Sequence, residues 1–329
     1  MFTRLIPLVG TLGMLAQLAC NEASPQNEAT ESTSTASRST AAPMHQFAGA
    51  WTLRRIERRN ADGTLTAPPI ENRVGYLIYD AAGYMGVTIM RPNRKPYSEE
   101  GPTANEALEQ LGTYTSYFGR FSVNEAEGFV THHLEGSLNP SGAGANYQRF
   151  YTLEDNKLTL QPPAAQNGSR SYLTWEKLPD LPESILTDTH ERLFGFYQIE
   201  SVSRHTSNGE SIPVDQYDTA YIIYAPSGHM SVHLMRTGRR PYAGNRPTEE
   251  EALLAVQTYG SYFGPFSVNE DEEYLIHHRI GSENPGGSGT DAKRFYELTD
   301  THLTLRPPIS TDDAGRQVQS ALRWARISH

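Results

Sequence analysis

Hydrophobic and polar positions alternate through most of the chain, in short runs that Gly, Asn, Asp and Pro separate. Alternation with a period of two, in runs rich in Tyr, Phe, Val, Ile and Thr, is typical of β-strands with one buried face. The turns between these runs are short, as at Ala81-Ala82-Gly83 and Asp155-Asn156. In the first half of the chain the pattern predicts strands at residues 51–58, 74–80, 84–91, 117–124, 129–136, 148–154, 157–161 and 171–176.

Two segments depart from this alternation and have the spacing of a helix. Each follows a proline and begins with a capping box, Thr103 to Glu106 and Thr248 to Glu251, whose side chains bind the free amides of a helix start. Apolar residues then recur on one helical face, namely Ala107, Leu108, Leu111 and Tyr114, and Ala252, Leu253, Val256 and Tyr259. We predict a short helix between the third and fourth strands of each copy, lying across its own barrel or sheet.

The chain is a tandem duplication. Residues 76–163 can be laid on residues 221–308 at one constant offset without a gap, and roughly half of the paired positions are identical. The segment Ser116-Tyr117-Phe118-Gly119, for example, is matched by Ser261-Tyr262-Phe263-Gly264. We therefore predict two domains, at residues 45–178 and 191–329, each large enough to bury its own core. A proline-stiffened linker at residues 179–190 is expected to join them.

About eight antiparallel strands in one domain must hide the backbone groups at the two edges of their sheet. Closing the sheet into a barrel removes both edges and leaves an interior wide enough for side chains or one small ligand. The strands follow one another largely through tight hairpins, which favours a barrel over a sandwich. The sequence therefore predicts an all-β protein of two tandem antiparallel barrels.

Several segments resemble the bacterial lipocalin-like domain family. Gly49-Ala50-Trp51 resembles the Gly-x-Trp signature of lipocalins, and GYLIYDAAGYMGVTIMRP, SYFGRFSVNE and VTHHLEGSLNP resemble further parts of the family. The second copy departs at its start, where Gly195-Phe196-Tyr197 replaces the tryptophan motif. The resemblance implies calycin-type barrels that hold small apolar molecules. It implies no particular ligand or reaction, because lipocalin-like folds also occur as isomerases and cyclases.

The amino terminus has the pattern of a bacterial export signal. Arg4 precedes a mostly apolar run from Leu5 to Leu18, which is shorter than a membrane span. Cys20, the only cysteine, follows in a context that resembles the lipobox of bacterial lipoproteins, with Gln17 where that motif usually has Leu. We expect a signal peptide at residues 1–20, acylation of Cys20 and a disordered Ser/Thr/Ala-rich tether at residues 21–44.

From these features we expect a protein of the bacterial cell envelope, at the outer membrane or the periplasmic face, with the lipid anchor as its only contact with the membrane. An ordinary secreted protein is the alternative. The formal net charge is -10 and no stretch gathers the basic residues, so the footprint of a nucleic-acid-binding protein is missing. We therefore expect no nucleic-acid partner, and no cofactor. We also expect no bound metal ion, because the adjacent His132 and His133 point to opposite faces of one strand and cannot bind the same ion.

The alternation also predicts which side chains line each barrel. Aromatic and aliphatic residues share the inward face with two arginines in each copy. A buried guanidinium needs a partner. These arginines either bind the anionic head of a ligand or are structural, with one packed on Trp51 or Trp175 and the other paired with Glu125 or Glu135. The candidate ligand-binding residues of this set are Arg91, Tyr117, Arg149 and Tyr151, and Arg236, Tyr262, Arg294 and Tyr296.

One histidine of each adjacent pair must face the interior, and the neighbouring residues disagree about which. Thr131 and Glu135 mark the face of His133 as outer, whereas Ile276 and Ile280 mark the matching face of the second copy as inner. We take His133 and His278 as the inward residues. They are candidate ligand contacts and the only candidates for acid–base catalysis.

The sequence leads to the hypothesis of an envelope protein that binds a small hydrophobic molecule, with or without an anionic group, in one or both barrels. An isomerase or cyclase that uses the inward His, Tyr and Arg is a second candidate, although the sequence favours a protein that is not an enzyme. A third candidate is a structural or interaction module whose barrels are filled by side chains. The presence of a cavity would separate the third candidate from the other two.

Overall fold

The computed structural model describes residues 44–328, which belong to one compact unit. The expected signal peptide, the acylation site at Cys20 and all but the last residue of the expected tether lie outside the described residues. Within the described range, no helix is both long and apolar enough to cross a lipid bilayer.

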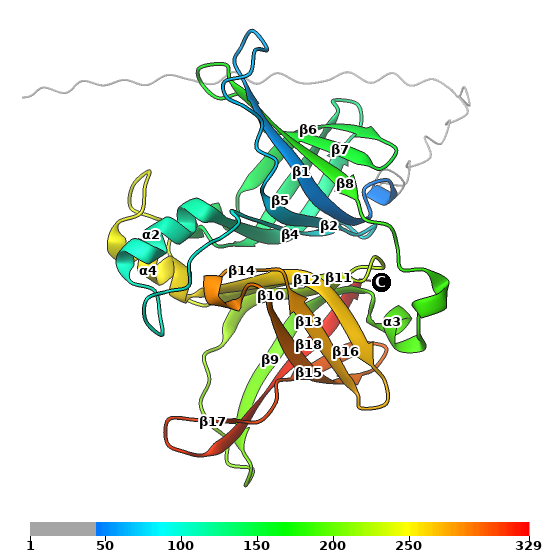
Figure 1. The fold of residues 1–329 in the computed structure, drawn as a ribbon, viewed down its shortest axis with the longest axis vertical. Helices are drawn as coiled ribbons and strands as arrows, with labels where there is room; N and C mark the ends of the chain where they lie inside the picture. Colours follow the sequence, from blue (N-terminus) through cyan, green and yellow to red (C-terminus); the bar gives the residue numbers. More distant parts are fainter. Residues whose placement is uncertain (1–43, 329) are drawn as a thin grey trace, which may run out of the picture. The chain divides into compact units, whose positions relative to one another are not determined.

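The first copy forms a closed antiparallel barrel in which each strand pairs with its neighbour in sequence and the last strand pairs with the first (Figure 1). The eight predicted strands are confirmed with small changes at their ends; β4, for example, begins at Tyr114 instead of Tyr117. The strands are β1 Gly49–Arg59, β2 Val74–Tyr79, β3 Tyr84–Met90, β4 Tyr114–Asn124, β5 Phe129–Ser137, β6 Asn146–Glu154, β7 Lys157–Gln161 and β8 Arg170–Lys177.

The second copy repeats this ring. Its strands are β9 Gly195–Thr206, β10 Tyr217–Tyr224, β11 His229–Arg236, β12 Tyr259–Asn269, β13 Tyr274–Arg279, β14 Gly281–Ser282, β15 Thr290–Leu298, β16 His302–Arg306, β17 Ser310–Thr311 and β18 Gln317–Ser328. Pairing of β18 with β9 and of β11 with β12 closes the barrel, while β14 and β17 are short additions to it. The prediction of two tandem barrels is therefore confirmed.

Each barrel has its own apolar core, built from the inward-facing residues, which are every second residue along each strand. In the first barrel this core includes Trp51 and Trp175, and the short segment before β1 inserts Phe47, which accepts a hydrogen bond from the Trp51 indole at 2.8 Å. In the second barrel Tyr197 stands near the base in place of the tryptophan motif. Its hydroxyl donates to the carbonyl of Leu193 at 3.1 Å, at the end of helix α3 (Asp188–Leu193).

A third core joins the two barrels and is built reciprocally. The rings of Tyr76 and Phe263 lie 5.1 Å apart, and those of the equivalent residues Tyr221 and Phe118 lie 4.8 Å apart. Hydrogen bonds between hydroxyl groups follow the same reciprocal pattern, between Tyr114 and Ser261 at 2.7 Å and between Ser116 and Tyr259 at 3.0 Å. Each copy thus offers the same surface to the other, as the subunits of a two-fold dimer do.

Two equivalent arginines, one from each copy, also bind the other copy through hydrogen bonds. Arg94 donates to the carbonyls of Ser282 and Glu283 at 2.7 and 2.8 Å. Its equivalent Arg239 donates to the carbonyls of Ser137 and Leu138 at 3.0 and 2.6 Å. Each planar guanidinium binds two neighbouring carbonyls at once, which fixes the other copy's loop in place.

The two predicted helices form where the capping boxes indicate, as α2 (Ala104–Thr113) and α4 (Glu249–Gln257). Both capping boxes are complete. The prediction that each helix lies across its own barrel is wrong, because the apolar faces meet each other (Figure 1). Ala107 packs with Ala252 and Val256 of the other copy, since small side chains allow the two helices a close approach.

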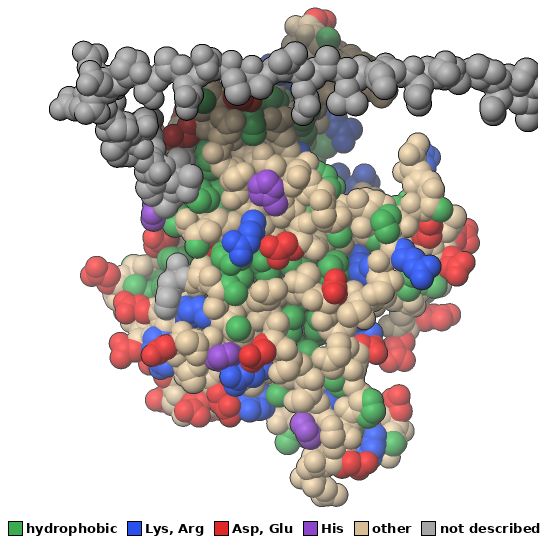
Figure 2. All heavy atoms as spheres, turned by 180° about the vertical axis from the view of Figure 1, so that it is seen from behind, with side chains coloured by type: hydrophobic (Ala, Val, Ile, Leu, Met, Phe, Trp, Pro, Cys, Tyr) green, Lys and Arg blue, Asp and Glu red, His purple; other side chains and the backbone are tan. Residues whose placement is uncertain are grey.

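The surface carries charges of both signs. Acidic and basic side chains are interspersed over the face that Figure 2 shows. Several form exposed ion pairs, such as Arg54 with Glu176 at 2.7 Å and Arg316 with Asp312 at 2.9 Å. Such exposed pairs contribute little to stability, so the fold depends on its three apolar cores.

Candidate functional site

A histidine held by two tyrosines lies inside the first barrel. His132 is fully buried, and its Nε2 and Nδ1 lie 2.6 and 3.1 Å from the hydroxyls of Tyr79 and Tyr117. Burial lowers the pKa of His132 to about 3, and the electrostatic effect of the nearby Arg149 and His133 lowers it further. The imidazole is therefore neutral at physiological pH.

The second barrel repeats this triad with the equivalent residues. Tyr224 and Tyr262 place their hydroxyls 2.8 and 2.9 Å from Nε2 and Nδ1 of His277. Burial lowers the pKa of His277 well below its usual value, assisted by Arg294, Arg279 and His278. Both copies thus keep one neutral histidine between two phenols.

The choice of His133 and His278 as the inward histidines is wrong. Phe121, an inward residue of β4, pairs directly with His132, which turns His133 outward. His133 contacts Ser122 at 2.9 Å and Asn146 at 2.7 Å, and His278 contacts Ser267 and Asp291 at 3.0 and 2.9 Å. The polar Thr131 and Glu135 indicated the outer face of the first copy correctly, whereas the apolar Ile276 and Ile280 of the second copy were misleading, because Ile280 is 39% exposed although it is apolar. Glu135 accepts a hydrogen bond from Tyr221 of the other copy at 2.6 Å.

Replacement of the two adjacent histidines by alanine tests this assignment. We expect H132A to lower the free energy of unfolding by about 2–4 kcal/mol, because it leaves a cavity and two buried phenols without their partner. H133A, the neighbouring control, should cost less than about 1 kcal/mol because the side chain lies at the surface. Urea unfolding curves measure both values, and equal losses would contradict the assignment.

Two of the four candidate arginines point inward. Arg149 lies on the inward face of β6, where its charge opposes the rise that burial causes in the pKa of Tyr117 and adds to the fall in the pKa of His132. Arg294 lies on the inward face of β15 and has the same effects on the pKa of Tyr224 and of His277. Arg91 and Arg236 do not line the interior: Arg91 is exposed beyond the end of β3, and Arg236 pairs with the exposed Asp215. Arg91 lies one residue past β3 and Arg236 is the last residue of β11, so at both strand ends the side chain can turn away from the face that alternation assigns to it.

The structural alternative for these arginines is not what the structure shows either. The cation near Trp51 at the barrel base is Lys177, 5.7 Å from the centre of the ring, and Arg326 takes the matching place 4.6 Å from Tyr197. Glu135 pairs with Arg120 at 3.5 Å. Arg149 and Arg294 are therefore left for another role.

The candidate tyrosines all lie on inward faces. Tyr117 and Tyr262 hold the buried histidines. Tyr151 packs edge to face on Phe47 at 5.0 Å, deeper in the first barrel, and Tyr296 packs against the core of the second barrel. Tyr151 and Tyr296 therefore serve the cores, whereas Tyr117 also borders open space.

A cleft of about 550 Å³ opens at one end of the first barrel, which we call its mouth. The mouth lies where β4 begins, β5 ends and β6 begins. Rings of Tyr114, Tyr117 and Tyr147 and the guanidinium of Arg149 line the cleft. The loop after β5 and the residues Tyr242, Gly244, Asn245 and Pro247 of the second copy complete its wall.

Among the residues of this cleft that sequence reasoning missed are two tyrosines, Tyr147 and Tyr242. Tyr147 shares the inward face of β6 with Arg149, whose guanidinium lies 5.0 Å from the Tyr147 ring, so alternation alone could have found it. Tyr242 could not have been found, because it reaches the cleft only through the contact between copies. Its hydroxyl is buried and has no hydrogen-bond partner within residues 44–328.

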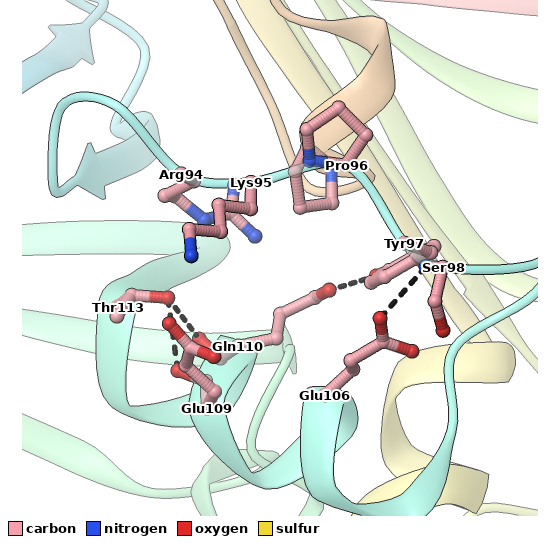
Figure 3. Close-up of a pocket in the computed structure, with 10 residues that line it drawn as sticks. Arg94, Lys95, Pro96, Tyr97, Ser98, Glu106, Glu109, Gln110 and Thr113 are labelled. Carbon is pink, nitrogen blue, oxygen red and sulfur yellow. Dashed lines mark hydrogen bonds between the residues drawn. The ribbon is translucent and has the colours of Figure 1, made fainter.

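A smaller hollow of about 250 Å³ lies between residues 94–98 and helix α2 (Figure 3). Its polar groups bind one another: Tyr97 donates to Gln110, and the amide of Ser98 donates to Glu106 at 2.8 Å. Gln110 also donates to the buried Glu283 of the second copy. A matching hollow of about 330 Å³ borders α4. Because these groups are already satisfied, we assign the hollow at α2 to the contact between copies.

Comparisons with known proteins bear on the fold. A family model described as a lipocalin-like domain matches residues 48–178 and 194–327. A protein of unknown function from the DUF3598 family of Nostoc punctiforme is similar at 10% identity over 88% of this chain and 100% of that chain, with a TM-score of 0.25. No curated protein is a detectable relative.

Transferrin-binding protein B from two bacteria is also similar. The protein of Haemophilus parasuis matches at 6% identity over 85% of this chain and 76% of its own, with a TM-score of 0.19. That of Neisseria meningitidis serogroup B matches at 8% identity over 85% and 77%, with a TM-score of 0.21. At these scores the solved structures carry no argument about function.

Proposed function

The chain belongs to the lipocalin-like domain family through both of its copies, and on that premise we propose that its first barrel binds a small molecule with an apolar body and an anionic end. The cleft at the mouth of this barrel carries the proposal. Its volume of about 550 Å³ falls within the range of roughly 300–1,000 Å³ that small-molecule sites occupy.

The lining of the cleft supports an amphipathic ligand. The rings of Tyr114, Tyr117 and Tyr147 give the cleft apolar lining, while the hydroxyls of Tyr114 and Tyr117 are already bound by Ser261 and His132. Arg149 donates to the carbonyl of Gln148 at 2.8 Å but forms no ion pair with any carboxylate of the described residues. A half-buried cation without a counter-ion favours a ligand that brings one.

The geometry supports binding over catalysis. A general base must be free to take a proton from its substrate, and both ring nitrogens of His132 are already engaged by tyrosine hydroxyls. A purely structural barrel would be filled throughout, whereas here the core fills the base and the mouth stays open. Carriage of a ligand is therefore the function that the site supports best.

A fluorescence titration with 11-(dansylamino)undecanoic acid tests the proposal. We expect saturable binding that R149M weakens by roughly ten-fold or more, because a charge-assisted hydrogen bond to the carboxylate is lost. Y147A, which installs the alanine that the second copy has at this position, should weaken binding less, because it removes the ring that packs on Arg149 and keeps the guanidinium.

The control variant is R170M, which removes an exposed arginine of β8 and should leave the affinity unchanged. The methyl ester of the probe is a second control, because R149M should not affect the binding of an uncharged molecule. Absence of saturable binding, or equal effects of R149M and R170M, would overturn the proposal.

A further inference from the structure

Two arginines stand opposite each other at the mouth of the first barrel. Arg73 directly precedes β2 and Arg91 directly follows β3. Val74 pairs with Met90 in these two antiparallel strands, so the arginines are the next pair in the same register. Like charges that lie directly opposite each other destabilise a sheet, so this pair costs stability instead of adding to it.

A third arginine, Arg58, lies near the end of β1, the strand beside β2. Arg58 and Arg91 are exposed, and Arg73 is partly buried. Burial lowers the pKa of Arg73, and the charges of Arg91 and Arg58 lower it further, so the three guanidinium groups lie within electrostatic reach of one another. We call these three residues the arginine rim.

No carboxylate of residues 44–328 forms an ion pair with the arginine rim. The acidic residues closest to it in sequence, Glu57 and Glu71, pair with Arg55 instead, at 2.8 and 3.8 Å. Glu57 also accepts a hydrogen bond from Arg59 at 2.7 Å. These pairs use the neighbouring negative charges and leave the charge of the arginine rim unbalanced.

The second copy balances the corresponding positions. Asp218 stands in place of Arg73, and Arg236, the equivalent of Arg91, pairs with Asp215. The local excess of positive charge is therefore a property of the first copy, in which the open cleft also lies.

The arginine rim borders that cleft. Met90 pairs with Tyr114, which lines the cleft, and the amide of Arg91 donates to the carbonyl of Thr113 at 2.8 Å. The whole chain has a formal net charge of -10, and the field of this charge repels an anion that approaches the protein. Exposed charges at the edge of a site act mainly on the rate of association, whereas a charge that contacts the bound partner acts on dissociation.

We propose that the arginine rim attracts anionic amphiphiles and steers them into the cleft of the first barrel, so that it selects them over neutral molecules by their rate of association. Arg149 then holds the anionic group once the ligand is bound. The inference deepens the proposed function and rests on it, and it assigns a role to residues that lie outside the cleft itself.

Stopped-flow kinetics with 11-(dansylamino)undecanoic acid test this inference on the full chain. At about 0.01 M salt we expect R73Q to lower the association rate constant by roughly three-fold or more and to leave the dissociation rate constant unchanged. R73D, which installs the aspartate of the second copy, should lower association further. R91Q should act in the same direction and serves if the variants of Arg73 do not fold. At about 1 M salt all these differences should disappear, because the charges are screened.

The matched control is K157Q, which removes one exposed positive charge where β7 begins, at the other end of the same barrel, and should not change the association rate. The methyl ester of the probe should associate equally fast with every variant. An equal loss of rate in K157Q, or for the ester, would overturn the inference. Unchanged association in R73Q and R91Q, while R149M still speeds dissociation, would overturn it and leave the proposed function intact. Absence of saturable binding to the wild type would overturn both.

Discussion

Replacement of Phe118 by alanine is expected to lower the free energy of unfolding by about 3–5 kcal/mol. Phe118 is fully buried in the core between the barrels, where its ring lies 4.8 Å from that of Tyr221 and 5.3 Å from that of His233. Alanine would remove the contacts that this ring makes with Tyr221 and His233 of the second copy and leave a cavity between the barrels. Denaturant unfolding monitored by tryptophan fluorescence measures the loss.

Because the contact between the copies is reciprocal, the equivalent residue of the second copy gives a second prediction. F263A should cost about as much, because Phe263 packs on Tyr76 in the same way at 5.1 Å. F150A is the control: Phe150 is 37% exposed and should cost no more than about 1 kcal/mol. Similar small losses for all three variants would show that the third core does not join the barrels.

The second large effect is a dependence of stability on pH that Glu283 causes. This carboxyl is buried between the copies, and burial raises its pKa to about 8, although Arg94 and Arg239 oppose the rise. An unfolded Glu has a pKa near 4.3, so between about pH 4.5 and 8 the folded state holds a proton that the unfolded state has released. Stability is therefore greatest at the acidic end of this window and declines by about 1.4 kcal/mol for each pH unit until about pH 8.

The variant E283Q isolates this effect, because an amide keeps the shape of the side chain and does not titrate. We expect E283Q to match the wild type at pH 5 and to exceed it in stability at pH 8. E99Q, at an exposed position, is the control and should follow the wild type throughout. Unfolding free energies from urea at pH 5, 6.5 and 8 measure this, and a constant difference between wild type and E283Q would contradict the prediction.

The strands and helices were predictable because their signals are local. The alternation of side chains across β1 to β8 depends only on neighbouring residues, and each capping box spans only four positions, as Thr103 to Glu106 shows. The duplication strengthened these predictions, because the same strand pattern and the same capping box occur in both copies. Closure into barrels followed because exposed strand edges are unfavourable.

The inward histidine and the inward arginines were harder to predict because they depend on pairing between strands. His132 faces inward because it pairs with Phe121, whereas the polarity of the residues beside the histidine pair gave opposite answers in the two copies. The apolar Ile280 was a poor guide, because a single exposed position can carry an apolar side chain, whereas the polarity of Glu135 did indicate the outer face. Arg149 was assigned correctly from alternation, whereas Arg91 lies beyond the strand and escapes that rule.

The sequence by itself determined the all-β class, the two copies, the strands, the helix starts and the set of residues shared by both barrels. Only the tertiary structure decided that the copies face each other, that α2 packs on α4, and that Tyr242 of one copy borders the cleft of the other. The reason is physical: alternation records that a face is apolar, not which apolar surface covers it. A residue such as Phe118 looks the same in sequence whether its ring is buried inside its own barrel or against the next one.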